Sequence, residues 1–129
     1  MKDLGKFGAS HRFAAEDLDG NGSPEYLFAE GKKLTVFAAD GHKLFDRTFP
    51  ELISESPFVC PLTKGNNKIG VVVGAANKIY LLEMNGTVTK GFPLEGNTAF
   101  IAGKFSDSSS WYNLVVGDES NTLVNYRIE

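Results

Sequence analysis

The 129-residue sequence contains a single cysteine, two histidines and no apolar run near the length of a membrane-spanning helix. With Cys60 alone, an internal disulfide and a zinc site built on several cysteines are both excluded. A helix that crosses a bilayer needs about 20 consecutive apolar residues. We therefore expect no membrane span, and we interpret Cys60, which lies in an apolar stretch, as a small buried hydrophobe.

An excess of positive charge is also missing. The formal net charge is −3 and the pI is near 5.4. A nucleic-acid partner requires a basic face, so a nucleic-acid-binding function is not expected. The first ten residues have no apolar segment of the kind found in a signal peptide, but a mature domain cut from a secreted precursor would look the same.

No segment combines the apolar periodicity and the capping residues of a helix, whereas Phe, Gly and β-branched residues are abundant. Instead, the sequence repeats itself. Residues 12–41 align without a gap on residues 57–86 at an offset of 45, and a looser third copy runs from Ala99 to Glu129, with Phe100 aligned with Phe58. Three of the aligned pairs are Phe13 with Phe58, Gly20 with Gly65, and Gly41 with Gly86.

Each copy predicts short strands joined by turns. Apolar runs mark the second and third strands, at residues 26–29, 69–73 and 114–116 and at residues 34–37, 79–82 and 123–126. Asp40-Gly41 and Asn85-Gly86 are hairpin signals, and a fourth strand is expected to follow each, over residues 43–49 and 87–92, closed by Phe-Pro.

Four short antiparallel strands in about 45 residues are typical of one β-propeller blade. We therefore predict an all-β chain of three consecutive four-stranded antiparallel blades in a single domain, at about residues 11–50, 56–93 and 98–129. A β-sandwich or a small barrel would explain the short strands but not the internal period. The third copy stops before its final strand, and residues 3–8, from the same chain or a neighbouring one, are our candidate for that missing strand.

Three blades do not close a ring, because propellers typically have four to eight. Two apolar blade faces would stay uncovered, and such faces require a partner. We expect an excised piece of a longer propeller, with the remaining blades of the parent protein as its partner. The alternatives are a second copy that completes a six-bladed ring, and collapse into a less regular stack of sheets.

The stretch DLDGNGSPEYLFAEGKKLTVFAADG, with the Phe-Pro endings, resembles the FG-GAP or VCBS type of propeller repeat found in integrin heads and many bacterial surface proteins. The acidic motif of that repeat is present in the first copy only. The second copy has TKGNNK in its place, and the third keeps Asp107 alone. The resemblance implies an extracytoplasmic location, periplasmic or on the cell surface.

The acidic loop at residues 17–25 carries the chemistry of a calcium site. Calcium takes six to eight oxygen ligands, and oxygen-bearing side chains two residues apart in a tight loop can converge on one ion. A helix-loop-helix site would need a Glu at its twelfth position, which is Phe28 here, so we predict a strand-loop-strand site with a structural calcium. The predicted ligands are Asp17, Asp19, Asn21, the backbone carbonyl of Ser23, and Glu25. The alternative is a solvated hairpin turn, since turns favour the same residues.

No catalytic constellation is apparent. His11 and His42 fall at opposite ends of different strands, and no serine lies in a Gly-x-Ser-x-Gly elbow. Trp111, Tyr112 and Tyr126 are either blade-packing residues or a platform for a sugar. We predict a non-catalytic binding or scaffold module for a protein or carbohydrate ligand. The alternatives are a piece of a propeller-based polysaccharide lyase or hydrolase and a purely structural repeat.

Overall fold

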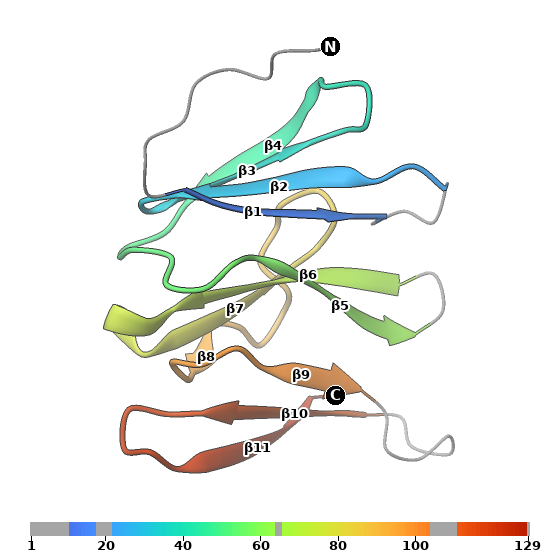
Figure 1. Ribbon diagram of the computed structural model, residues 1–129. Helices are drawn as coiled ribbons and strands as arrows, with labels where there is room; N and C mark the ends of the chain where they lie inside the picture. The colour runs from blue at the N-terminus through green and yellow to red at the C-terminus, as the bar shows by residue number, and fades with distance from the viewer. Residues whose placement is uncertain (1–10, 18–21, 64–65, 104–110, 129) are drawn as a thin grey trace.

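The chain folds into three antiparallel β-sheets that follow one another in sequence and stack face to face (Figure 1). The structure, a computed structural model, describes residues 11–17, 22–63, 66–103 and 111–128. The first sheet contains β1 (His11–Glu16), β2 (Glu25–Glu30), β3 (Lys33–Phe37) and β4 (Lys43–Thr48), paired in that order. The second contains β5 (Phe58–Thr63), β6 (Asn66–Val73), β7 (Lys78–Leu82) and β8 (Leu94–Glu95), and the third contains β9 (Ile101–Gly103), β10 (Tyr112–Gly117) and β11 (Leu123–Ile128).

The predicted all-β character is confirmed for this part of the chain. Its one helical element is a single 3-10 turn at Gly74–Ala76. Within the described ranges, no helix is long and apolar enough to cross a membrane. Within each sheet, strands that follow each other in sequence pair with each other, which is what short local hairpins predict.

Both predicted hairpin turns are present. Gly41 and Gly86 have φ angles of 93° and 91°, a conformation that glycine adopts without steric cost. In each turn the glycine N–H bonds to a carbonyl three residues earlier, at 2.9 Å in both cases. The Asp-Gly and Asn-Gly pairs therefore fix where β3 and β7 end.

Two hydrophobic clusters hold the stack together, one on each side of the second sheet. Ile69, Val71 and Val73 of β6 point toward the first sheet and Val72 points toward the third, and all four are fully buried. Because side chains alternate between the faces of a strand, a strand covered on both sides is a continuous apolar run. The cluster facing the first sheet is joined there by Leu27, Ala29, Leu34 and Val36, and the other by Leu114 and Val116 of the third sheet.

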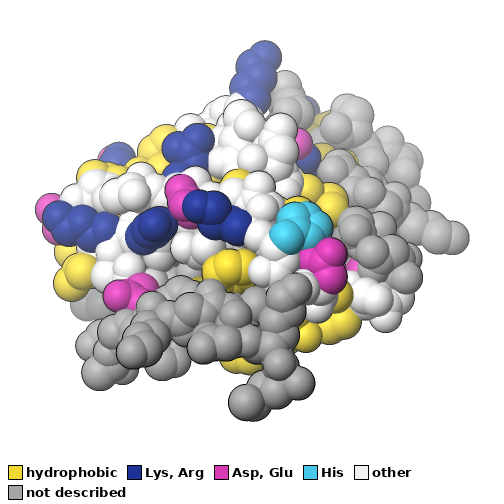
Figure 2. Space-filling view, turned by 90° about the horizontal axis from the view of Figure 1, so that it is seen from above, with side chains coloured by type: hydrophobic (Ala, Val, Ile, Leu, Met, Phe, Trp, Pro, Cys, Tyr) yellow, Lys and Arg dark blue, Asp and Glu magenta, His cyan; other side chains and the backbone are white. Residues whose placement is uncertain are grey.

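The first sheet also has a row of aromatic side chains on its outer face, away from the second sheet. Phe28 makes ring contacts with Phe13 at a centroid distance of 5.0 Å and with Phe37 at 5.9 Å. Tyr26 stacks on Phe13 at 6.2 Å. Figure 2 views the molecule from this side and shows hydrophobic side chains among charged ones.

The predicted fourth strand at residues 87–92 is wrong. The chain makes one bridge, between Leu82 and Val88, and then turns at Gly91, which has a φ of 95°. The strand itself is β8, which pairs with Lys78 and Ile79 of β7 after this turn. Phe92-Pro93 therefore precedes the fourth strand of the second sheet, whereas Phe49-Pro50 follows that of the first.

The gapless alignment also misplaces the first strands. Phe13 pairs with Phe28, but Phe58 pairs with Gly70 and not with Val73, the residue aligned with Phe28. The register between β5 and β6 differs from that between β1 and β2, because the hairpin after β5 is shorter than the loop after β1. An odd shift in register moves a side chain to the other face of the sheet. Phe58 accordingly contacts Phe100 in the cluster between the second and third sheets, at a centroid distance of 4.9 Å.

The third sheet has three strands in the part of the chain that the structure describes, where a complete copy of the repeat would have four. Among the described residues, no strand pairs with the outer edge of β11, where the fourth strand is expected. Residues 3–8, our candidate for that strand, lie outside the described residues.

Candidate functional site

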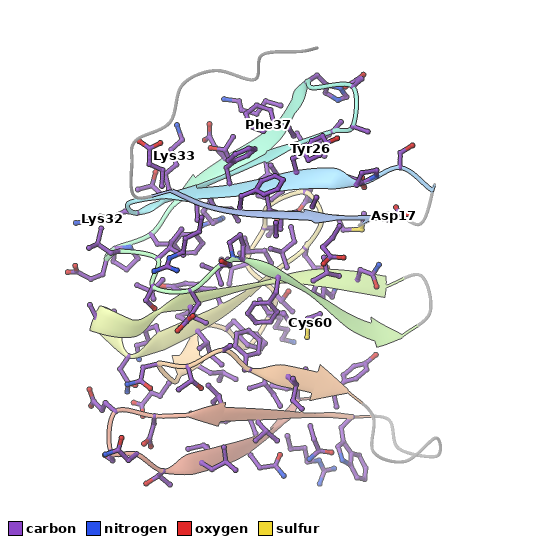
Figure 3. All side chains as sticks on the ribbon, in the orientation of Figure 1. Asp17, Tyr26, Lys32, Lys33, Phe37 and Cys60 are labelled. Atoms are coloured by element: carbon purple, nitrogen blue, oxygen red, sulfur yellow. The ribbon has the colours of Figure 1, made fainter. Side chains whose placement is uncertain are left out.

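The acidic loop joins β1 to β2 at one end of the first sheet. Glu16 and Glu25 are cross-strand partners, so the backbones that lead into and out of the loop lie side by side. Figure 3 shows Asp17 at this end and Lys32 and Lys33 at the other. The first and last predicted ligands, Asp17 and Glu25, are thus brought to the two sides of the loop mouth by the pairing of β1 with β2.

Asp17 organises the return of the loop. Its Oδ2 accepts a hydrogen bond of 2.9 Å from the backbone N–H of Gly22. Gly22 has a φ of 89°, which a residue with a Cβ adopts rarely, so glycine is required for this reversal. The loop therefore reverses at Gly22, and one carboxylate oxygen of Asp17 is held against the backbone of that turn.

Glu25 is buried, with 4% of its surface exposed. Side chains alternate between the two faces of β2, so Glu25 lies on the same face as Leu27 and opposite to Tyr26. The Glu25 side chain is therefore directed toward the second sheet. Carboxylates are rarely buried unless they are paired or bind a metal. Ser23, in contrast, is exposed at the loop surface.

Asp19 and Asn21, the other two predicted ligands, lie outside the described residues. Among the residues that are described, no group of three or more His, Cys, Asp or Glu side chains stands ready to hold a metal. Asp17, Ser23 and Glu25 offer only oxygen donors, which is the chemistry that calcium prefers. In donor type alone, these three residues are compatible with a calcium ion.

The second sheet has a lysine where the first has its acidic loop. Lys68 aligns with Ser23, is 9% exposed, and donates to both carboxylate oxygens of Glu83, at 2.6 and 2.7 Å. Thr89 donates a further hydrogen bond to Glu83. Burial raises the pKa of Glu83, but the bonds from Lys68 and Thr89 outweigh it and hold the pKa below its ordinary value of 4.5. At the position aligned with Ser23, the second copy therefore has a lysine ammonium that is paired with a carboxylate of its own sheet.

The turns between second and third strands gather at the opposite end of the stack, together with the connections between sheets (Figure 1). The backbone N–H of Ile53, in the first connection, bonds to the carbonyl of Gly31 at 2.9 Å. In the second connection, Gly96 bonds to Asn77 at 3.2 Å and Asn97 to Gly117 at 2.8 Å. Each connection is thus held against a turn of the sheet that it leaves, and Asn97 also reaches the sheet that it enters.

Two hydroxyl groups in these connections were not singled out from the sequence. The Oγ of Ser54 accepts a hydrogen bond from the N–H of Gly74, and Oγ1 of Thr98 accepts one from the N–H of Gly117. Both glycines follow the last apolar residue of a second strand. A glycine after an apolar run is visible in the sequence, but its hydroxyl partner, 19 or 20 residues away, is not.

The remaining candidates separate in the structure. Cys60 is 3% exposed in the cluster between the second and third sheets, and burial raises the pKa of its thiol, so its predicted role as a buried hydrophobe is confirmed. His42 is exposed in a turn beside Asp40, and the side chain of His11 lies outside the described residues.

The three aromatic residues of the third copy do not form one platform. Tyr126 packs against the second sheet and donates a hydrogen bond of 2.9 Å to the carbonyl of Glu95. Arg127, the next residue along β11, points to the other face and lies over the ring of Trp111 at 3.8 Å. Tyr126 and Trp111 therefore lie on opposite sides of the third sheet.

Comparison with models of known protein families and with curated proteins found no match for this chain.

Proposed function

We propose that this chain is a non-catalytic binding or scaffold module, built from β-propeller-type blades of the FG-GAP or VCBS kind and belonging to an extracytoplasmic protein. The repeated stacking of meander sheets supports the architecture. In this proposal the outer faces of the first and third sheets pack on further blades, supplied by a longer parent protein or by a second copy.

The acidic loop is proposed to hold one structural calcium, with Asp17, Asp19, Asn21, Ser23 and Glu25 as its ligands. The observation that carries this proposal is the pairing of β1 with β2, which brings Asp17 and Glu25 to the two sides of the loop mouth. A bound cation would add a further link between these two strands. In this proposal calcium cross-links the loop and takes part in no reaction.

The surface proposed to meet a protein or carbohydrate ligand is at the other end of the stack. There the turns and the connections from all three sheets come together (Figure 1). Loops positioned by a rigid scaffold are where binding residues concentrate. The calcium would act at a distance from this surface, by holding the first hairpin in place.

Thermal unfolding with calcium or with a chelator tests the calcium proposal. A ligand that binds only the folded state stabilises it by about 2.7 kcal/mol at 100 times its Kd, so the melting temperature is expected to rise by several degrees. Asp19→Ala should remove the increment, because it deletes one carboxylate of the loop. Glu119→Ala, which removes a charge at the opposite end of the molecule, is the matched control and should keep the increment. Equal melting temperatures with calcium and chelator would identify the loop as a solvated turn.

A further inference from the structure

The hairpin turn after β7 contains Asn85-Gly86, a chemically reactive pair. Asn85 is exposed, and Gly86 has a φ of 91°. An asparagine that precedes glycine is prone to lose its side-chain amide, because glycine has no Cβ to shield its backbone nitrogen. Neither the proposed calcium site nor the proposed ligand surface uses this turn.

The reaction consumes only water. The backbone nitrogen of Gly86 gives its proton to solvent and attacks Cγ of Asn85, so that an N–Cγ bond forms and a cyclic succinimide closes. The Cγ–Nδ2 bond breaks, and Nδ2 takes up a proton and leaves as ammonia. Water then opens the ring at Cγ, which gives aspartate, or at the main-chain carbonyl carbon, which gives isoaspartate. Either product carries one more negative charge than asparagine.

In the folded hairpin, hydrogen bonds hold both reacting groups. The N–H of Gly86 donates to the carbonyl of Glu83 at 2.9 Å. The Oδ1 of Asn85 accepts a hydrogen bond of 3.0 Å from the backbone N–H of Thr87. The first bond keeps the proton on the attacking nitrogen, and the second holds the side chain of Asn85 in one orientation. The reaction therefore requires the turn to open, which is a local event that needs no unfolding of the core.

The first sheet has the same turn with an aspartate in place of the asparagine. Asp40-Gly41 stands one repeat earlier, and the N–H of Gly41 bonds to the carbonyl of Ala38 at 2.9 Å. The Oδ1 of Asp40 accepts a hydrogen bond of 3.0 Å from the N–H of His42. These two bonds match those of the Asn85-Gly86 turn in both partners and length. An aspartate therefore fits this turn, whereas an isoaspartate, which adds its Cβ to the main chain, has no counterpart in it.

The turn after β7 also joins two sheets. The carbonyl of Gly86 accepts a partly buried hydrogen bond of 2.8 Å from Nε of Arg47, in β4 of the first sheet. A Cβ at Gly86 would lie 2.6 Å from the ring of Phe45, in the same strand. Because the lengthened linkage of an isoaspartate comes directly before Gly86, it displaces the carbonyl that Arg47 binds.

We propose that Asn85 is a deamidation site that its hairpin protects in the folded chain and releases when the turn opens. The aspartate product keeps the contact with β4, and the isoaspartate product breaks it. The site is thus a one-way chemical switch in the contact between the first and second sheets. This inference uses only the two hairpins and β4, and it depends neither on calcium nor on further blades.

Peptide mapping of protein aged at neutral pH, folded or in urea, follows the reaction at single residues. Trypsin cuts after Lys78 and Lys90 and releases Asn85 as the only asparagine of residues 79–90. The next peptide contains Asn97, which precedes Thr98 and is the internal control. Mass spectrometry detects the exchange of amide for carboxylate in each peptide.

Asn85 is expected to convert faster than Asn97 in both states. Folding should slow its conversion at least about tenfold, because the turn must first break the bonds of Gly86 and Asn85. Equal rates at Asn85 in folded and unfolded protein would show that the hairpin does not control the reaction. A folded chain in which Asn85 converts no faster than Asn97 would overturn the assignment of the site.

A substitution in β4 tests the link to the first sheet. Arg47→Ala removes the bond to Gly86 and should raise the folded-state rate at Asn85 at least about threefold, with no change in urea. Lys43→Ala, in the same strand but paired with Asp46, is the matched control and should keep the wild-type rate. General unfolding would accelerate Asn97 as well, so a rise confined to Asn85 reports the turn. Equal rates in wild type and Arg47→Ala would contradict the link.

The two products are compared by thermal unfolding. Asn85→Asp should melt within about 2 °C of the wild type, as the turn at Asp40 indicates. The isoaspartate form, separated by ion exchange and identified with an isoaspartate-specific methyltransferase, should melt at least about 4 °C lower. If Asn85→Asp is destabilised as much as the isoaspartate form, the two products do not differ in the way proposed.

Discussion

The hydroxyl of Ser54 accepts a hydrogen bond of 3.0 Å from the backbone N–H of Gly74. Ser54 lies in the connection between the first two sheets, and Gly74 directly follows β6, the second strand of the sheet that the connection enters. Thr98 and Gly117 repeat this contact one sheet later, at 2.9 Å. A Cβ at Gly74 would lie 2.9 Å from the hydroxyl oxygen, and one at Gly117 would lie 2.9 Å from the Thr98 methyl group. The absence of a side chain at both glycines is therefore what lets each connection approach its sheet.

Removal of the Ser54 hydroxyl should destabilise the fold measurably. Ser54→Ala leaves the Gly74 N–H without its side-chain acceptor, and a lost hydrogen bond of this kind costs about 1–2 kcal/mol. Urea unfolding is the measurement. Ser56→Ala, in the same connection but exposed, is the control and should change the free energy of unfolding by less than about 0.5 kcal/mol. Similar losses for both variants would show that the bond to Gly74 contributes nothing specific.

The ring of Phe58 is predicted to be the reason why position 70 requires a glycine. A Cβ at Gly70 would lie 2.4 Å from two ring carbons of Phe58, so Gly70→Ala must displace the ring and is expected to cost about 1–3 kcal/mol. Gly103→Ala is the matched control, since nothing lies within 4 Å of its added methyl group. In a Phe58→Ala background the Gly70→Ala cost should largely disappear. If the two costs simply add, the ring does not set the requirement for glycine.

The Lys68–Glu83 pair should make the free energy of unfolding depend on pH in the acidic range. The pKa of Glu83 is lowered in the folded state, so its contribution is complete above its unfolded value of about 4.5 and is lost as the pH falls through the folded value. Glu83→Gln is expected to cost about 1–3 kcal/mol at neutral pH, because the ammonium of Lys68, which is 9% exposed, loses its charged partner. Below pH 4 the gap between wild type and variant should narrow. Denaturant unfolding across this pH range measures it, and a constant gap would show that Glu83 does not titrate with folding.

The elements that could be predicted from sequence are those set by local chemistry. Gly41 and Gly86 were assigned to hairpins because few other residues adopt their backbone angles, and the buried strand β6 was recognised from its apolar run. The last strand of the second copy was placed wrongly, because Lys90-Gly91 forms a turn within residues 87–92, whose sequence is typical of a strand. Nothing in its local residues distinguishes Gly91 from a glycine tolerated in a strand.

The register between the first and second strands of each sheet could not be predicted from the sequence either. Phe13 and Phe58 align in sequence, but β1 and β2 are joined by a loop from Asp17 to Pro24, whereas Thr63 of β5 already pairs with Asn66 of β6. Loop length fixes which residues face each other, and a gapless alignment contains no information about it. In the candidate site, the spacing of Asp17 and Glu25 pointed to the loop, but the burial of Glu25 depends on the second sheet and was not predicted.

Calorimetric titration of the full chain with calcium tests the central claim most directly. Since the acidic motif is present in the first copy alone, and Lys68 occupies the aligned place in the second, the account predicts one binding site per chain, lost in Asp19→Ala and weakened in Glu25→Gln. If the proposed extracytoplasmic location holds, a Kd of about 10⁻⁴–10⁻³ M is expected, as for calcium sites of extracellular modules. Absence of binding heat up to about 10 mM calcium, ten times the upper value, or a stoichiometry of two or three ions that survives Asp19→Ala, would contradict it.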